Sequence, residues 1–298
     1  SEWLCKLLLN GHVYRSFIPD TTLRQLRQLN RQRYFYTGHS SQVKNRILKV
    51  LEAGNLKLRS VLSNINTKSA RNIVQALANG ETDIQVLQSC CLGKAAKKSA
   101  LLPEALEGTL TTNDKILLQL HLKDWQYYDQ QILQLEKVIT TVVQQHYAET
   151  LSLLLLVPGI GELSARTIIA EVGHTLESFP TPDHFTSWAG LAPGNRQSAN
   201  SWYAQQGTKG NKYFRSTLIQ VACAAGRTRK GYWQAHFQYL RKRLPAKKAL
   251  VAIARKMAKL LYRVIKDHYT YEEKGAAYFT ERRQHYSSNN PSQWPGIF

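Results

Sequence analysis

Acidic residues are scarce in this sequence of 298 residues, where 20 Asp and Glu stand against 40 Lys and Arg, a formal net charge of +20. So large a positive excess attracts polyanions, and the usual polyanion for an intracellular protein is nucleic acid. The alternative is a basic protein without such a partner, because net charge bears on partners and not on fold.

Cysteines and long apolar runs are scarce too. The four cysteines are Cys5, Cys90, Cys91 and Cys223, and no pair has the spacing of metal ligands. Adjacent Cys90 and Cys91 would make a poor disulfide framework, so we expect buried free thiols in a reducing compartment. The longest relevant apolar stretch, Leu153 to Val157, is too short to span a membrane, and no signal-peptide pattern is present.

Only one methionine occurs, Met257, and the sequence opens with Ser1. Residues 2–8 already have the apolar pattern of a helix, without a capping residue before them. We interpret the sequence as a fragment that begins within a secondary-structure element. Its length and its 43% hydrophobic content predict a folded chain with one large domain or two modest ones.

Charge divides the sequence into three parts. Residues 1–110 hold 16 basic and 7 acidic residues (net +9), residues 111–150 hold 3 and 5 (net −2), and residues 151–298 hold 21 and 8 (net +13). This pattern suggests two parts that face nucleic acid, joined by one that faces protein. In the first part Arg24, Arg27 and Arg31 share a helix face, which fits a solvated surface and a phosphate-tracking one equally well.

The acidic segment contains the clearest helical pattern. Its apolar residues follow a heptad frame, with His121 and His146 as polar exceptions: Leu118, Trp125, Tyr128, Ile132, Leu135, Ile139 and Val142. We therefore predict a coiled-coil helix over residues 111–150 that mediates self-association. Trp125 at a core position favours a loose antiparallel or multi-helix packing. The alternative is an ordinary long helix packed inside one domain.

A hairpin between two helices is predicted around Pro158 and Gly159. An apolar helix ends there, and a second helix begins after Gly161. In a helix-hairpin-helix motif the glycines allow close backbone approach, and the amides at the start of the second helix point at a phosphate. Gly159 and Gly161 are therefore candidate nucleic-acid contacts, although a plain helical turn is the alternative.

A loop rich in Gly, Pro, Ser and Asn follows, from Pro180 to Gly210, and it holds Ser198. After it, helices are predicted over Lys212 to Ala225 and Pro245 to His268. The cations around the loop and at the starts of these helices are candidate phosphate ligands: Arg196, Lys209, Lys212, Arg215, Lys247 and Lys248. A serine can attack a phosphodiester when a base, a metal ion or cations activate it, but by composition alone Ser198 is an ordinary loop serine.

The later helix has a core stripe at Ala249, Ile253, Leu260, Leu261 and Val264. A second face carries only cations: Arg255, Lys256, Lys259 and Arg263. Such a basic face suits a nucleic-acid groove and a solvated surface equally.

The run from Leu151 to Lys266 resembles the serine-bearing transposase domain of the IS110 insertion-sequence family, and best its eleven-eleven subgroup. The shared motifs are the Pro-Gly-Ile-Gly hairpin at 158–161, the Trp-Ala-Gly-Leu-Ala-Pro segment at 188–193, the Ser198-Ala199 pair, the Lys-Gly-Asn-Lys turn at 209–212 and the basic, alanine-rich helix. Residues 16–19 and 44–47 are similar to the family's connecting region. Residues 1–4 resemble the segment that directly follows its last acidic catalytic residue.

This resemblance implies a DNA transposase, or site-specific recombinase, that cuts and rejoins DNA by transesterification. Ser198 matches the family's nucleophilic serine. An upstream RNase-H-like domain supplies four acidic residues that hold a divalent metal, expected to be Mg²⁺, and those positions all precede residue 1, so no metal ligand is assigned here. Asn200 and Ser201 depart from the usual glycine and lysine. The resemblance further implies a structured guide RNA, dimers or tetramers, and a place in the bacterial cytoplasm at the nucleoid.

We therefore predict a mainly α fold in four parts: a remnant and connecting helices over 1–110, the coiled-coil helix over 111–150, the transposase domain with its helix-hairpin-helix over 151–275, and a flexible tail over 276–298. The first alternative is a remnant that binds nucleic acid and oligomerises without catalysis. The second is a helix-hairpin-helix repair protein, for which Asp183 is the only nearby candidate for a catalytic residue.

Overall fold

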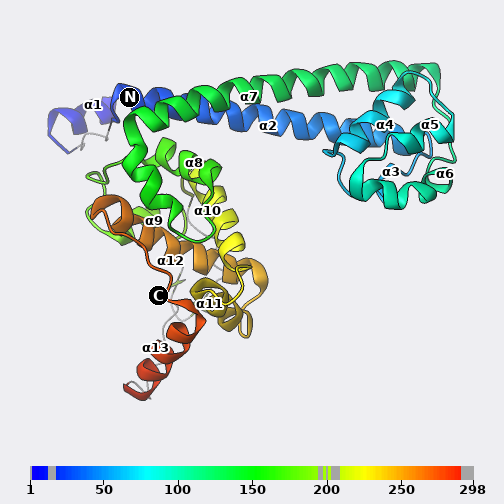
Figure 1. Cartoon of the computed structure of the whole chain (residues 1–298). Coiled ribbons are helices and arrows are strands. Elements are labelled where there is room, and N and C mark those ends of the chain that lie inside the picture. Colours follow the sequence, from blue (N-terminus) through cyan, green and yellow to red (C-terminus); the bar gives the residue numbers. More distant parts are fainter. Residues whose placement is uncertain (1, 13–17, 194–196, 199–200, 203–208, 290–298) are drawn as a thin grey trace. The chain divides into compact units, whose positions relative to one another are not determined.

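Helices dominate the computed structural model of the chain (Figure 1), which describes residues 2–12, 18–193, 197–198, 201–202 and 209–289. Two short strands, β1 (Gln197–Ser198) and β2 (Ser201–Trp202), pair antiparallel. The prediction of a mainly α fold is confirmed. Ser1, residues 16–17 of the predicted connecting region and residues 290–298 of the predicted tail lie outside the described residues.

The chain forms two compact units. Unit 1 comprises Ser1–Asn30 and Ile139–Phe298, and unit 2 comprises Arg31–Val138. Two long helices, α2 (Thr21–Ala53) and α7 (Thr112–Leu155), contribute residues to both units. The structure thus divides the chain inside helices, and not at the ends of the segments that charge and periodicity suggest.

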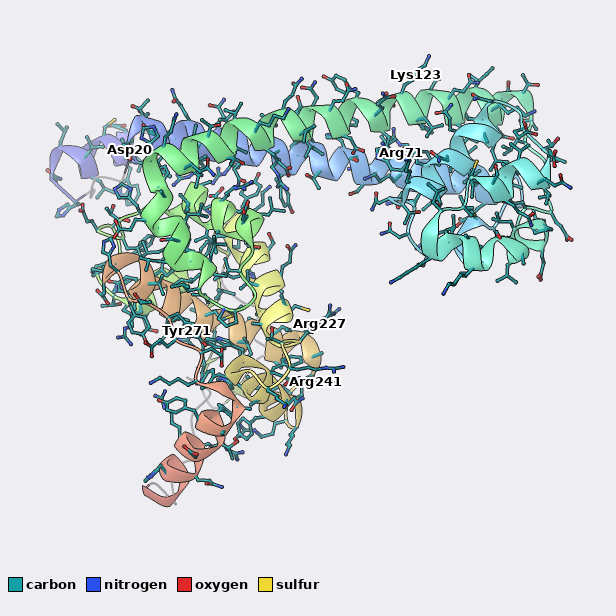
Figure 2. All side chains as sticks on the ribbon, viewed as in Figure 1. Asp20, Arg71, Lys123, Arg227, Arg241 and Tyr271 are labelled. Atoms are coloured by element: carbon teal, nitrogen blue, oxygen red, sulfur yellow. The ribbon has the colours of Figure 1, made fainter. Side chains whose placement is uncertain are left out.

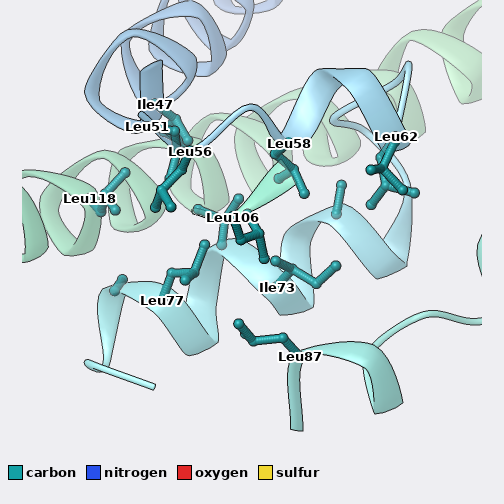
Figure 3. Close-up of a cluster of buried hydrophobic side chains, with 14 of the residues drawn as sticks. Ile47, Leu51, Leu56, Leu58, Leu62, Ile73, Leu77, Leu87, Leu106 and Leu118 are labelled. Atoms are coloured by element: carbon teal, nitrogen blue, oxygen red, sulfur yellow. The ribbon is translucent and has the colours of Figure 1, made fainter. Parts of the chain in front are cut away.

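Unit 2 adds five short elements to its parts of α2 and α7: α3 (Leu58–Val61), α4 (Lys68–Ala78), α5 (Ile84–Ser89), the 3₁₀ helix η1 (Gly93–Leu101) and α6 (Leu102–Ala105). Side-chain caps start two of them, because Thr67 accepts a hydrogen bond from the amide of Ala70 and Asp83 accepts one from the amide of Gln85. The core of this unit is formed mainly by leucine, isoleucine, valine and alanine side chains of its helices, including Ile47, Ile73 and Leu106 (Figure 3).

Three heptad positions of α7 in unit 2, Leu118, Trp125 and Tyr128, pack against other parts of the same chain. Trp125 is 1% exposed, and two cations lie over its ring: the Cζ atom of Arg71 at 4.1 Å and the Nζ atom of Lys44 at 5.0 Å from the centroid. Next to it, Asp129 pairs with Arg71 and accepts a hydrogen bond from Ser40 Oγ at 3.3 Å. Trp125 therefore sits in a multi-helix packing of α2, α4 and α7.

Unit 1 is built around α12 (Ala246–Lys266), which contacts α9, α10 and α11. Its stripe of Ala249, Ile253, Leu261 and Val264 is buried, as the periodicity predicts, and Leu260 is half-buried. The other helices of this unit are α1 (Glu2–Leu9), α8 (Glu162–Val172), α9 (Pro182–Trp188), α10 (Lys212–Ala225), α11 (Tyr232–Arg241) and α13 (Gly275–Asn289).

Helix α13 replaces much of the tail expected from residue 276. Its Phe279 stacks on His236 of α11 with centroids 4.9 Å apart, and the Cζ atom of Arg283 lies 3.7 Å from the ring centroid of Tyr239. The polar composition from residue 276 suggested a mobile segment, but through these aromatic contacts α13 packs on α11. Among the described residues, no helix is both long and apolar enough to cross a membrane.

Candidate nucleic-acid interface

The predicted hairpin lies between α7, which ends at Leu155, and α8, which begins at Glu162. Gly159 adopts a φ of +85°, and a Cβ atom there would lie 2.5 Å from the carbonyl oxygen of Val221 and 2.7 Å from the amide nitrogen of Ala225. Only glycine fits this approach without a shift of backbone. The close neighbour of Gly159 is therefore the backbone of α10.

Gly161 is in a different situation. It is the N-cap residue of α8, it is exposed, and a Cβ atom there would meet nothing within 4 Å. The amides of the first helical turn carry a partial positive charge. Of the two hairpin glycines, Gly161 is thus the one whose surroundings leave room for a ligand.

The loop that carries Ser198 is closed at its base. The amide of Asn211 donates a hydrogen bond of 3.1 Å to the carbonyl oxygen of Trp188, and a Cβ atom at Gly210 would lie only 2.2 Å from the nitrogen of Gly190. The Trp188 ring also packs on Phe214 of α10, with centroids 5.5 Å apart. Two motifs that are separated in sequence, residues 188–190 and 209–212, are therefore in direct contact.

Ser198 lies in β1, and the register pairs it with Ser201 of β2. The positions of its side chain and of the Ser201 side chain are outside the described part of the structure, as are Arg196 and Asn200 entirely. The described ends of the loop still show that the chain leaves Gly190 and returns to Gly210 at almost the same point.

Cations gather where the loop runs into α10. Asn211 caps this helix, and its Oδ1 atom accepts hydrogen bonds from the amides of Tyr213 at 3.0 Å and Phe214 at 3.1 Å. Lys209 and Lys212 are exposed beside the cap, and Arg215 is half-buried one turn later. Cationic side chains around a helix N-terminus favour an anion such as a phosphate.

Sequence reasoning missed a buried carboxylate behind this turn. Glu171 of α8 is 1% exposed, and its Oε2 atom accepts a hydrogen bond of 2.6 Å from Asn211 Nδ2. Arg27 of α2 approaches the same oxygen at 3.9 Å and donates to the carbonyl oxygens of Ala170 and Glu171. One signal was available, because Glu171 is the single charged residue in the apolar run of residues 168–172.

The basic face of α12 is largely engaged inside unit 1. Lys259 Nζ lies 2.7 Å and Arg255 3.3 Å from Oδ1 of Asp183, and the hydrogen bond from Lys259 is the main reason that the pKa of Asp183 is lowered. Lys256 Nζ lies 3.2 Å from Nε2 of the buried His236, and burial lowers the pKa of both groups. This face is therefore poorly placed to serve as a groove-binding surface.

Other cations of unit 1 remain at its surface. Lys247 and Lys248 are exposed in the first turn of α12. Arg227 and Arg241 are also exposed, just after the end of α10 and at the last residue of α11 (Figure 2). Within the described ranges, no three His, Cys, Asp or Glu side chains come together as metal ligands would. The residues described here thus offer cations for phosphates and no set of ligands that fits a divalent metal.

Comparison with known proteins adds a family to this geometry. Residues 151–238 match the model of the transposase family IS116/IS110/IS902. The match spans the hairpin, the serine-bearing loop, α10 and most of α11.

Several curated proteins are similar over about the same length of chain. A pilin gene-inverting protein of Moraxella bovis is 32% identical over 126 residues, which are 41% of this chain and 39% of that protein. A probable family 20 transposase of Pseudomonas aeruginosa is 34% identical over 121 residues, 38% of this chain and 34% of that protein. An uncharacterised insertion-element IS110 protein of Streptomyces coelicolor is 29% identical, over 39% of this chain and 29% of that protein. The matched part thus spans two fifths or less of each of these relatives.

Proposed function

We propose that the protein acts in DNA transposition by cutting and rejoining DNA strands, because residues 151–238 match the model of the transposase family IS116/IS110/IS902. The observation that carries the proposal is the closed base of the serine-bearing loop. It brings residues 188–190 against the cationic turn of residues 209–212. The relatives' names, which speak of transposition and of gene inversion, agree with this class of reaction.

In the proposed reaction the hydroxyl oxygen of Ser198 attacks a DNA phosphorus. A serine–phosphate bond forms as the bond to the leaving sugar oxygen breaks, and that oxygen takes up a proton to balance the one that the serine loses. A sugar hydroxyl of another strand then attacks the same phosphorus, forms the new strand bond and releases the serine hydroxyl. Lys209, Lys212 and Arg215 would hold the phosphate and balance its charge, with Arg196, Lys247 and Lys248 as further contacts. Each step exchanges one phosphate ester for another, so the bond energy is conserved and no nucleotide is consumed.

A serine hydroxyl is a weak nucleophile and needs activation. The family resemblance implies Mg²⁺ on acidic residues for this task, but the described residues contain no fitting set of ligands. We propose that the ligands belong to an acidic domain outside residues 1–298. The chain tested alone should then bind DNA and leave it uncut.

The proposal extends to partners. The resemblance implies a structured guide RNA and a homo-oligomer, and α7 supplies the surface for self-association. Its apolar residues Ile116, Leu120, Tyr127 and Val138 are exposed on one side of the helix. A position at the nucleoid in the bacterial cytoplasm follows from DNA as the substrate.

The decisive experiment looks for a covalent serine–DNA adduct. The chain is combined with the acidic domain of a family member and incubated with end-labelled DNA and Mg²⁺. We expect an adduct that resists denaturation, maps to Ser198 and disappears in Ser198→Ala while DNA binding persists. The matched control is Ser201→Ala, which alters the facing strand. An adduct that survives Ser198→Ala, or that maps to Ser201, would show that the nucleophile is misassigned.

The alternative function is a protein that binds nucleic acid and oligomerises without catalysis. The observation behind it is that the described residues hold no group of three or more His, Cys, Asp or Glu side chains that could bind a metal ion. DNA binding without any adduct, even when the acidic domain is supplied, would favour this alternative.

A further inference from the structure

A buried charge lies directly behind the cationic turn. Glu171 is flanked by Ile168, Ile169, Ala170 and Val172, all of them buried, and its side chain has no exposed surface. A carboxylate in such surroundings is costly unless hydrogen bonds and an opposite charge compensate it. Its partners therefore indicate what holds it there.

One partner of Glu171 precedes it in the chain and another follows it. Arg27 of α2 supplies the positive charge, 3.9 Å from Oε2, and its guanidinium also donates to the carbonyl oxygens of residues 170 and 171 at 3.1 and 2.9 Å. Asn211 Nδ2 donates the short hydrogen bond of 2.6 Å to the same oxygen. A hydrogen bond to an ionised acceptor is stronger than one between neutral groups.

Asn211 connects the buried carboxylate to both ends of the serine-bearing loop. The side-chain oxygen Oδ1 caps α10 by accepting from the backbone amides of Tyr213 and Phe214. The backbone N–H of Asn211 donates to the carbonyl oxygen of Trp188. The Asn211 side chain thus fixes the start of α10 and binds the buried carboxylate, while its backbone amide holds the first residue of the Trp-Ala-Gly segment. If the hydrogen bond to Glu171 is lost, the cap remains and α10 still packs on α8, but the turn before α10 loses its side-chain bond to α8.

We propose that Glu171 is a positioning residue, which acts through Asn211 to hold the base of the loop and the cations of the following turn in the geometry that a phosphate requires. This inference rests on the proposed function, because the phosphate is the ligand assigned to the turn. It adds a residue that would touch no DNA itself. It also links α2, through Arg27, to the loop that carries Ser198.

The first test measures hydrogen–deuterium exchange and needs no DNA. In Glu171→Leu the amides of Gly190, Leu191 and Asn211 should exchange about tenfold faster, because the base of the loop opens locally more often. Glu171→Gln keeps an oxygen that can accept from Asn211 and should restore most of the protection. If Glu171→Leu does not fold, Asn211→Ser serves instead, since serine can cap the helix but lacks the amide donor.

The matched control is Tyr262→Phe. It removes the hydroxyl that donates to the carbonyl oxygens of Phe179 at 2.8 Å and Pro180 at 3.1 Å and accepts from Lys266 Nζ at 2.6 Å, all in unit 1. It should lower the melting temperature without affecting exchange at residues 190–191 and 211. Exchange in folded Glu171→Leu or Asn211→Ser that stays within about twofold of wild type would overturn the inference.

The second test couples Glu171 to DNA binding. Fluorescence anisotropy with a short duplex at low salt gives the loss of affinity caused by Lys212→Ala, once in the wild-type chain and once in Glu171→Leu or Asn211→Ser. We expect Lys212→Ala to lower the DNA affinity about tenfold in the wild type and less than threefold in the variant, because in a misplaced turn Lys212 no longer contacts the phosphate. Equal losses in both backgrounds would overturn the positioning role. A wild-type chain that binds no DNA would instead overturn the proposed function, and the exchange result would still decide the anchoring.

Discussion

Gly210 and Gly190 meet backbone to backbone, so that a Cβ atom on Gly210 would lie 2.2 Å from the nitrogen of Gly190. Gly190 is itself buried, with a φ of +68°. This contact at the base of the serine-bearing loop is made by backbone atoms. It explains physically why a glycine is needed in the Lys-Gly-Asn-Lys turn.

Gly210→Ala should therefore destabilise unit 1 by about 2 kcal/mol or more, because two backbone segments must move apart to admit a methyl group. Urea denaturation followed by circular dichroism measures the loss. The control is Gly161→Ala, where the added methyl group meets nothing within 4 Å and the cost should stay below about 1 kcal/mol. Equal stabilities of the two variants would contradict the observed contact.

The two hairpin glycines should separate folding from DNA binding. Gly159→Ala should destabilise the fold, because its methyl group would collide with the backbone of α10. Gly161→Ala should fold normally and yet weaken DNA binding about threefold or more, if a phosphate approaches the backbone at the start of α8. Anisotropy titrations of the folded Gly161→Ala variant decide the point, and unchanged affinity would remove the hairpin from the interface.

DNA binding by the chain should depend strongly on salt. With roughly six to ten phosphates contacted by the cations of unit 1, the affinity should fall by about 10³–10⁵ between 50 and 200 mM salt. A titration series at several salt concentrations gives the slope. Removal of Lys212 should reduce that slope by about one unit, and binding that is insensitive to salt would refute an interface made of phosphate contacts.

Self-association should depend on the exposed side of α7. Leu120 and Tyr127 are each 52% exposed, whereas Ile132 and Leu135 of the predicted heptad core are half-buried. The double change Leu120→Lys and Tyr127→Lys should give monomers without loss of melting temperature. Ile132→Asp should mainly cost stability, because it places a charge in a packed position. Light scattering measures the mass, and a wild-type chain that is monomeric at high concentration would rule out this surface.

Stability should fall with acid through His236, which is 3% exposed. Burial, and after it the charge of Lys256, lowers the pKa of His236 from 6.5 to about 3. Above pH 6.5 the folded and unfolded chains both hold a neutral imidazole, and below it only the unfolded chain takes up the proton. Stability is thus lost as the pH falls from 6.5 towards 3, by about 2 kcal/mol at pH 5. His236→Gln should flatten this part of the profile, and parallel profiles for both proteins would contradict it.

Local chemistry made several elements predictable from sequence. Helices expected over Lys212 to Ala225 and Pro245 to His268 are observed as Lys212–Ala225 and Ala246–Lys266. The first is fixed by the side chain of Asn211, only one residue away from the helix it caps. The second is fixed by a periodic apolar stripe. The resemblance to the IS110 family was likewise visible in short motifs, and the family match confirms it.

Other properties depend on partners that are far away in sequence. The heptad frame of α7 shows which face is apolar, but not that Tyr128 would stack on His39 of α2, with centroids 5.5 Å apart. Arg27 belongs to a basic stripe in the sequence, yet in the fold it lies beside Glu171, 144 residues later. For the same reason, the cations of α12 look available until Asp183 and His236 are placed next to them.

The sequence by itself determined the helical class, the turn between α7 and α8, the motifs shared with the transposase family and the excess of positive charge, because each is set by neighbours within a few turns of chain or by composition alone. Only the tertiary structure decided which cations are engaged internally, why Gly159 and Gly210 must be glycine, and that the serine-bearing loop rests on a buried carboxylate. Those outcomes depend on which surfaces the folded chain brings into contact, and a periodic pattern states that a face will be covered without stating by what.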